Sequence, residues 1–170
     1  MKTITKLSYA FFMCASLAMV SCSGDDDGGS TNGGNTSGEY VKAKIDGSSW
    51  SSSSTIDVVS ASNPTESVLM VQGSNNSGEV IQISLMSFDG EGTYDVSSQI
   101  SGYAQYGTIS PIAFYNSAVG GGATGEVTIT EVTDTFVKGT FEFTGRNTEE
   151  GSNETVNVTN GEFKANFQQR

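Results

Sequence analysis

The stretch that decides the fold of this chain is TVNVTNGEFKANF, residues 155–167. Polar and apolar side chains alternate in it with a period of two, which is typical of a strand with one buried face. Asn160-Gly161 in its middle is a strong signal for a two-residue hairpin turn. The sequence therefore predicts two strands here, 155–159 and 162–168, joined by that turn. The side chains expected to point inward are Phe163, Ala165 and Phe167.

The same alternation recurs upstream, and turns rich in glycine and aspartate separate the runs. The clearest runs are 40–45, 68–72, 79–88, 126–132 and 136–144, with a hairpin signal at Asp46-Gly47. No segment keeps a 3.6-residue period, and leucine, a good helix former, occurs only four times. The sequence therefore predicts an all-β fold, an antiparallel β-sandwich or small barrel of about nine strands.

The N-terminal end follows a different pattern. Lys2 and Lys6 precede a mostly apolar run, residues 7–20. As a helix, this run is too short to cross a hydrocarbon core of roughly 30 Å. Such a run is typical of a secretory signal. It ends in Met19-Val20-Ser21-Cys22, which resembles a bacterial lipobox, with methionine where leucine is usual. We therefore expect residues 1–21 to be a lipoprotein signal peptide and Cys22 to carry acyl chains such as palmitate.

Residues 22–38 are expected to be the lipidated cysteine and a flexible tether. None of the 16 residues 23–38 is apolar, so the segment cannot build a core and is expected to be disordered. Its r.m.s. reach is roughly 22 Å. Solvation of the tether is one role for its acidic residues. They also resemble a surface-export signal of lipoproteins from Bacteroidota, which implies an outer-membrane protein facing the cell exterior. That signal comprises Ser23, Asp25, Asp26 and Asp27.

Composition restricts what the remaining domain, 39–170, is able to do. The formal charge of the chain is −11, and loss of Lys2 and Lys6 with the signal peptide makes it −13. An acidic chain is unsuited to nucleic acid. The chain has no histidine, which removes imidazole-based catalysis and the commonest metal ligand. We expect no enzyme and no cofactor. A carboxylate-based hydrolase, which needs no histidine, is the less favoured alternative.

Aromatic residues concentrate in the least regular part of the strand pattern. Tyrosine offers an apolar ring with a polar tip, which suits recognition and also ordinary strand packing. Ordinary strand packing is the favoured explanation, and this is also the region where we would place a recognition surface for a glycan or another surface protein. The alternative function is a carbohydrate- or protein-binding accessory module of an outer-membrane uptake system. Its candidate residues are Tyr94, Tyr103, Tyr106 and Tyr115.

Two further patterns are weak candidates for sites. Asp89, Glu91 and Asp95 surround a glycine turn and are conceivable calcium ligands, although turn chemistry explains them equally well. We therefore expect no metal site. Residues 120–125 match the dinucleotide fingerprint GxGxxG, but a strand follows where that motif needs a helix. We expect a loop there.

Three stretches, in this order, resemble a family of small Bacteroidota lipoproteins whose domain has no known function. They are AKIDGSSW at 43–50, GTFEF at 139–143 and VTNGEF at 158–163. The resemblance covers essentially all of 40–167. It implies an all-β lipoprotein domain without an established activity, so no functional residues are carried over. The expected partners are the membrane, through the lipid anchor, and a glycan or another surface protein.

Overall fold

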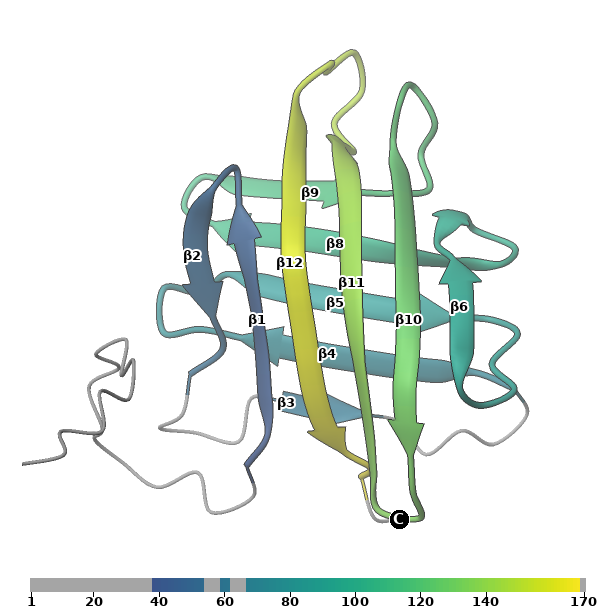
Figure 1. The fold of residues 1–170 in the computed structure, drawn as a ribbon. Coiled ribbons are helices and arrows are strands. Elements are labelled where there is room, and N and C mark those ends of the chain that lie inside the picture. The colour runs from purple at the N-terminus through teal and green to yellow at the C-terminus, as the bar shows by residue number, and fades with distance from the viewer. Residues whose placement is uncertain (1–37, 54–58, 62–66, 169–170) are drawn as a thin grey trace, which may run out of the picture. The chain divides into compact units, whose positions relative to one another are not determined.

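The computed structural model describes residues 38–53, 59–61 and 67–168 (Figure 1). The expected signal peptide, Cys22 and the acidic tether lie outside these residues. The described part is built of twelve strands and contains no helix. Among the described residues, the search for a helix long and apolar enough to cross a membrane finds none. The prediction of an all-β antiparallel fold is confirmed.

Many of the strands follow the alternating runs of the sequence, whereas the strands between residues 92 and 116 lie outside the clearest runs. They are β1 (Tyr40–Ile45), β2 (Ser48–Ser51), β3 (Val59–Ala61), β4 (Leu69–Ser74), β5 (Val80–Leu85), β6 (Gly92–Asp95), β7 (Ser97–Ser98), β8 (Gly102–Ile109), β9 (Ile112–Asn116), β10 (Thr124–Val132), β11 (Phe136–Asn147) and β12 (Thr155–Asn166). Residues 120–123 of the glycine-rich stretch form a turn, and the strand β10 begins at Thr124, so the loop expected before a strand is confirmed for these four residues.

The strands form one curled sheet, a half-barrel with two layers. Its order is β2-β1-β12-β11-β9-β8-β5-β4-β3, and β10 pairs with both β11 and β6. We call β2, β1, β12, β11, β10 and β6 the front layer, and β3, β4, β5, β8 and β9 the back layer. In Figure 1 the back-layer strands run across those of the front layer. The layers join where the end of β11 pairs with β9, and again where the Gln168 N–H donates to the Ala61 carbonyl at 2.9 Å.

The core lies between the two layers and is formed by the side chains that point inward from each strand. Phe163 is fully buried, and its ring centroid lies 6.3 Å from that of Phe141, which lies 6.5 Å from Phe143. Each such side chain stabilises the fold by about 1.5–3 kcal/mol through burial. The inward positions expected from the sequence, including Ala165 and Phe167, are buried as predicted.

Glycines on the inner face make room for these rings. Gly139 lies directly opposite Phe163, and Gly161 lies directly opposite Phe141. A Cβ at Gly139 would lie 2.8 Å from the Phe163 ring and 2.4 Å from the Thr128 carbonyl oxygen. These glycines are therefore required by close approach, which is one recognised role of glycine within a strand.

The prediction of a hairpin turn at Asn160-Gly161 is wrong, because β12 continues without a break through both residues. Asn160 adopts a φ of 52°, and the pairing register with β11 shifts between Phe141 and Phe143. The pair is thus a β-bulge, in which one extra residue is absorbed without reversing the chain. Pairing with β1 on one side and β11 on the other extends along both halves of β12, and a turn would forfeit it.

The other hairpin signal, Asp46-Gly47, forms the expected turn between β1 and β2. Both residues have positive φ, 48° and 85°, as a type I′ turn requires. Asp46 also accepts a hydrogen bond from the backbone N–H of Asn157 at 2.9 Å. This turn is free to reverse the chain because β2 stands at the edge of the sheet.

Candidate functional site

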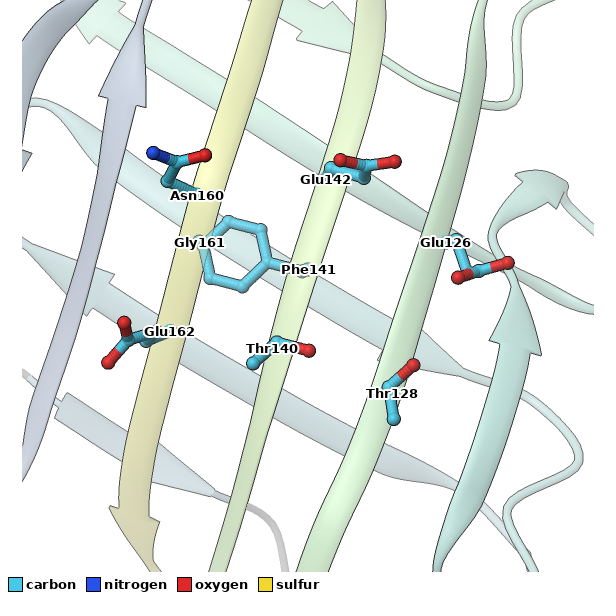
Figure 2. Close-up of a pocket in the computed structure, with 8 residues that line it drawn as sticks. All are labelled: Glu126, Thr128, Thr140, Phe141, Glu142, Asn160, Gly161 and Glu162. Atoms are coloured by element: carbon cyan, nitrogen blue, oxygen red, sulfur yellow. The ribbon is translucent and has the colours of Figure 1, made fainter.

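An open groove of about 470 Å³ lies on the outer face of β10, β11 and β12 (Figure 2). It is lined by Glu126, Thr128, Thr140, Phe141, Glu142, Asn160, Gly161 and Glu162. Two smaller hollows, of about 350 and 230 Å³, share some of these residues and extend the groove along the front layer. The polar side chains point outward because their apolar neighbours in each strand occupy the core.

The carboxylates of the groove come together through strand register. Glu126 on β10 lies directly opposite Glu142 on β11, and like charges in that relation are mutually unfavourable. Glu162 is paired with Lys42, with 3.1 Å between Oε2 and Nζ. Both side chains of that pair are about half exposed, so the pair contributes little stability.

The groove offers exposed carboxylates and hydroxyls rather than an enclosed reaction site. A carboxylate-based hydrolase places its acid in apolar surroundings that hold a proton near neutral pH. Glu126, Glu142 and Glu162 are all exposed on outer strand faces. This arrangement does not favour the hydrolase alternative. Within the described residues, no group of three or more acidic, cysteine or histidine side chains is placed to hold a metal ion.

The tyrosines expected to form a recognition surface do not share one face. Tyr106 on β8 and Tyr115 on β9 are cross-strand partners, and their ring centroids lie 6.3 Å apart. Tyr106 is only 6% exposed, so it cannot contribute to an exposed surface. Tyr103 lies three residues before Tyr106 and therefore points to the opposite face of β8.

A polar cluster surrounds the hydroxyl of Tyr106. This hydroxyl donates to Glu79 Oε1 at 2.5 Å, and Asn75 Nδ2 donates to Glu79 Oε2 at 2.6 Å. The bond from Tyr106 lowers the pKa of Glu79, and burial opposes that effect. Burial, together with the neighbouring Glu79 carboxylate, raises the pKa of Tyr106 well above its usual range. The ionised acid and the neutral phenol therefore stabilise each other.

The indole N–H of Trp50 lies beside this cluster. Its Nε1 is buried and has no partner of normal hydrogen-bond geometry among the described residues. The same N–H is nevertheless one of the groups that lower the pKa of Glu79. The two observations agree if the N–H is directed toward the carboxylate without full alignment. The buried indole of Trp50 therefore lies next to the partly exposed carboxylate of Glu79.

Tyr94 and two of the candidate calcium ligands, Asp89 and Asp95, form hydrogen bonds within local turns. The Tyr94 hydroxyl lies 2.8 Å from Asp89 Oδ1 and 2.7 Å from the Gly90 carbonyl oxygen, and its ring stacks on Phe88. Burial raises the pKa of Tyr94. Asp95 Oδ1 accepts hydrogen bonds from the backbone N–H and the hydroxyl of Ser97. These contacts are turn chemistry, and they hold Tyr94 in place.

The Tyr106–Glu79 contact predicts a pH dependence of stability. The folded pKa of Glu79 is below its ordinary value of 4.5, so its contribution is present above that pH and is lost as pH falls through the folded pKa. The folded pKa of Tyr106 is above its ordinary 10.0, so its contribution is present below pH 10.0 and is lost as pH rises toward the folded pKa. We expect stability to fall at both extremes.

Replacing Tyr106 by phenylalanine tests this contact. Urea denaturation at neutral pH should show a loss of about 1–2 kcal/mol, modest for a bond to a charged group because Glu79 is partly exposed. The loss should shrink in acid, where the carboxyl is protonated. Tyr103→Phe, on the opposite face, is the control and should change stability little. A Tyr106→Phe deficit that is equal at acid and neutral pH would contradict the assigned contact.

Comparison with known proteins gives one match. Residues 37–165 match the family described as Domain of unknown function (DUF6252). No curated protein and no solved structure matches the chain. The matched span includes every strand of the described fold except the last residue of β12. The chain therefore belongs to the DUF6252 family, and the matched domain is an all-β domain of unknown function.

Proposed function

We propose that this protein is a lipid-anchored outer-membrane protein that displays a non-catalytic all-β binding module on the cell exterior. The observation that carries the proposal is Met19-Val20-Ser21-Cys22 at the end of a short apolar run. Acylation at Cys22 would supply more than one chain, and two or more chains anchor a protein stably without a spanning helix.

The arrangement of the folded part supports the proposal. The strand β1 begins two residues after the tether ends, and Glu39 Oε1 accepts a hydrogen bond from the Asn166 backbone N–H at 2.7 Å. The fold is thus fastened close to its first described residue. Its core lies between its own two layers, so the module needs no membrane contact to bury its apolar side chains.

The proposal of a binding role rests on the chemistry available. The chain has no histidine, and the carboxylates of the front-layer groove are exposed. Outward strand faces rich in hydroxyl, amide and aromatic groups suit recognition of a glycan or of another surface protein. A purely structural role in the envelope is the competing reading, and a binding measurement separates the two.

Metabolic labelling with palmitate tests the anchor. We expect the wild-type chain to take up label and to fractionate with membranes, because Cys22 is the acylated residue. Cys22→Ala should abolish the label and leave the unprocessed precursor. Cys14→Ala is the matched control, since Cys14 lies within the apolar run and should not affect labelling. Equal labelling of wild type and Cys22→Ala would refute the proposal.

A further inference from the structure

Charge is divided unequally between the two layers of the fold. The strands β4, β5, β8 and β9 read LMVQGS, VIQISL, GYAQYGTI and IAFYN, and contain no charged residue. The lysines and glutamates of the strands lie instead in the front layer, on β1, β10, β11 and β12. We call the outer face of β4, β5, β8 and β9 the neutral face. On a chain of net charge −11, so large an uncharged face calls for a physical explanation.

A row of side-chain amides crosses the middle of the neutral face. Register places Gln72 opposite Gln82, Gln82 opposite Gln105, and Gln105 opposite Asn116. Asn116 Nδ2 donates to Gln105 Oε1 at 3.3 Å. Neighbouring strands are about 4.8 Å apart, so the row extends over roughly 14 Å. Gln72 is exposed and Gln82 and Gln105 are partly exposed, so these three amides meet solvent, whereas Asn116 is buried at the end of the row.

Aromatic rings border this row on both sides. Tyr103 precedes Gln105 by two residues on β8, and Phe114 precedes Asn116 by two residues on β9, so both share the outer face. Phe114 is 41% exposed, although it is a large apolar side chain. It packs over Gly107, where a Cβ would lie 2.9 Å from its ring. The face thus combines hydrogen-bonding amides with accessible ring surfaces.

We propose that the neutral face binds an uncharged glycan chain. An amide offers both donors and an acceptor, which matches the hydroxyl groups of a sugar. Tyr103 and Phe114 would pack against the apolar faces of sugar rings at either side of the amide row. Because the face has no charge, a neutral ligand covers it without desolvating an ion, and desolvation of an unpaired ion is expensive.

Other occupants fit the neutral face less well. An anionic polymer would need cationic partners that these strands lack, and the net charge of the chain would repel it. A protein partner or a lipid surface would favour an apolar centre, whereas amides occupy the centre here and the exposed Ile109 and Ile112 lie at the hairpin end of β8 and β9. This inference rests on the proposed binding role and specifies the ligand class. Palmitate labelling of Cys22 tests the anchor independently of glycan binding. A failure of one proposal can therefore be distinguished from a failure of the other.

A glycan microarray with neutral and anionic oligosaccharides, probed with the detergent-solubilised full chain, tests the inference. We expect binding to neutral glycans, weakened at least tenfold in a Gln82→Ala/Gln105→Ala variant and also by Phe114→Ala. Lys138→Ala, on the front layer, is the control and should bind as wild type does. Urea denaturation checks folding, and Phe114→Ala decides the matter if the double variant is unstable.

Several results would overturn the inference. One is the absence of binding to any neutral glycan on the array. Another is binding confined to anionic glycans. A third is glycan binding that Lys138→Ala abolishes while the neutral-face variants retain it. Self-association of the purified chain that Phe114→Ala abolishes, without glycan binding, would assign the face to a second copy instead.

Discussion

Replacing Phe163 by alanine is expected to lower the free energy of unfolding by about 3–5 kcal/mol. Phe163 is fully buried and packs against Phe141. Its ring also fills the space left by Gly139, directly across on β11. The cavity left by truncation would be bounded by strand backbone that pairs on both sides. Such a cavity has little freedom to collapse, which places the expected loss in the upper part of the range for large-to-small changes.

Urea denaturation measures the loss, with the denaturant slope checked against wild type. Phe114→Ala is the matched control, because the same side chain is removed from a site where the ring is 41% exposed. We expect that variant to lose less than half as much stability. A Phe163→Ala loss below about 1 kcal/mol would mean that the ring does not fill the core against Phe141 and Gly139 as described.

Replacing Asp25, Asp26 and Asp27 together by alanine is expected to keep the protein on the inner side of the outer membrane, where protease added to intact cells does not reach it. If the acidic run is an export signal, the variant should keep its palmitate label and its membrane fraction. Its tether should nevertheless change from a segment that added protease cuts to one that the protease does not reach. The expected loss of cleavage in intact cells is close to complete, because a protein retained beneath the outer membrane is not exposed to the medium.

The control separates export from solvation of the tether. Replacing Thr31, Asn32 and Asn35 by alanine alters the same stretch of sequence without touching the acidic run, and should leave accessibility unchanged. If the aspartates only solvate the tether, the triple alanine variant will remain as accessible as wild type. That outcome would contradict the export role of Asp25, Asp26 and Asp27 and would leave lipidation of Cys22 standing.

Strand positions followed from the sequence in the clearest alternating runs, but β8 lies outside those runs although alternate residues of it are buried. β1 has the predicted bounds, and the inward Phe141, Phe163 and Val127 are buried because alternation alone decides the face. Within those runs the prediction failed at Asn160-Gly161. Its local turn signal is overridden by pairing with β1 and β11, and those contacts come from residues distant in the sequence. Local patterns carry no information about that competition.

The candidate surfaces were less accessible to sequence reasoning. The separation of Tyr103 from Tyr106 is an odd number of residues, and this alone indicates opposite faces of one strand. The sequence does contain a signal for the neutral face, because no charged residue occurs between Asp95 and Glu126. Its amide row depended on the register of four strands, and register between strands is a tertiary property. The groove beside Glu142 likewise required the pairing of β10, β11 and β12.

Treatment of intact cells with a broad-specificity protease tests lipid-anchored surface display most directly. The tether of residues 23–38 has no apolar residue and should be cut, whereas the paired strands of the domain should resist. We predict release of a folded fragment close to residues 38–168 into the medium, with the acylated stub left in the membrane. Protection of the full-length chain until the cells are lysed would contradict surface display. Recovery of the untreated chain in the soluble fraction would contradict the anchor.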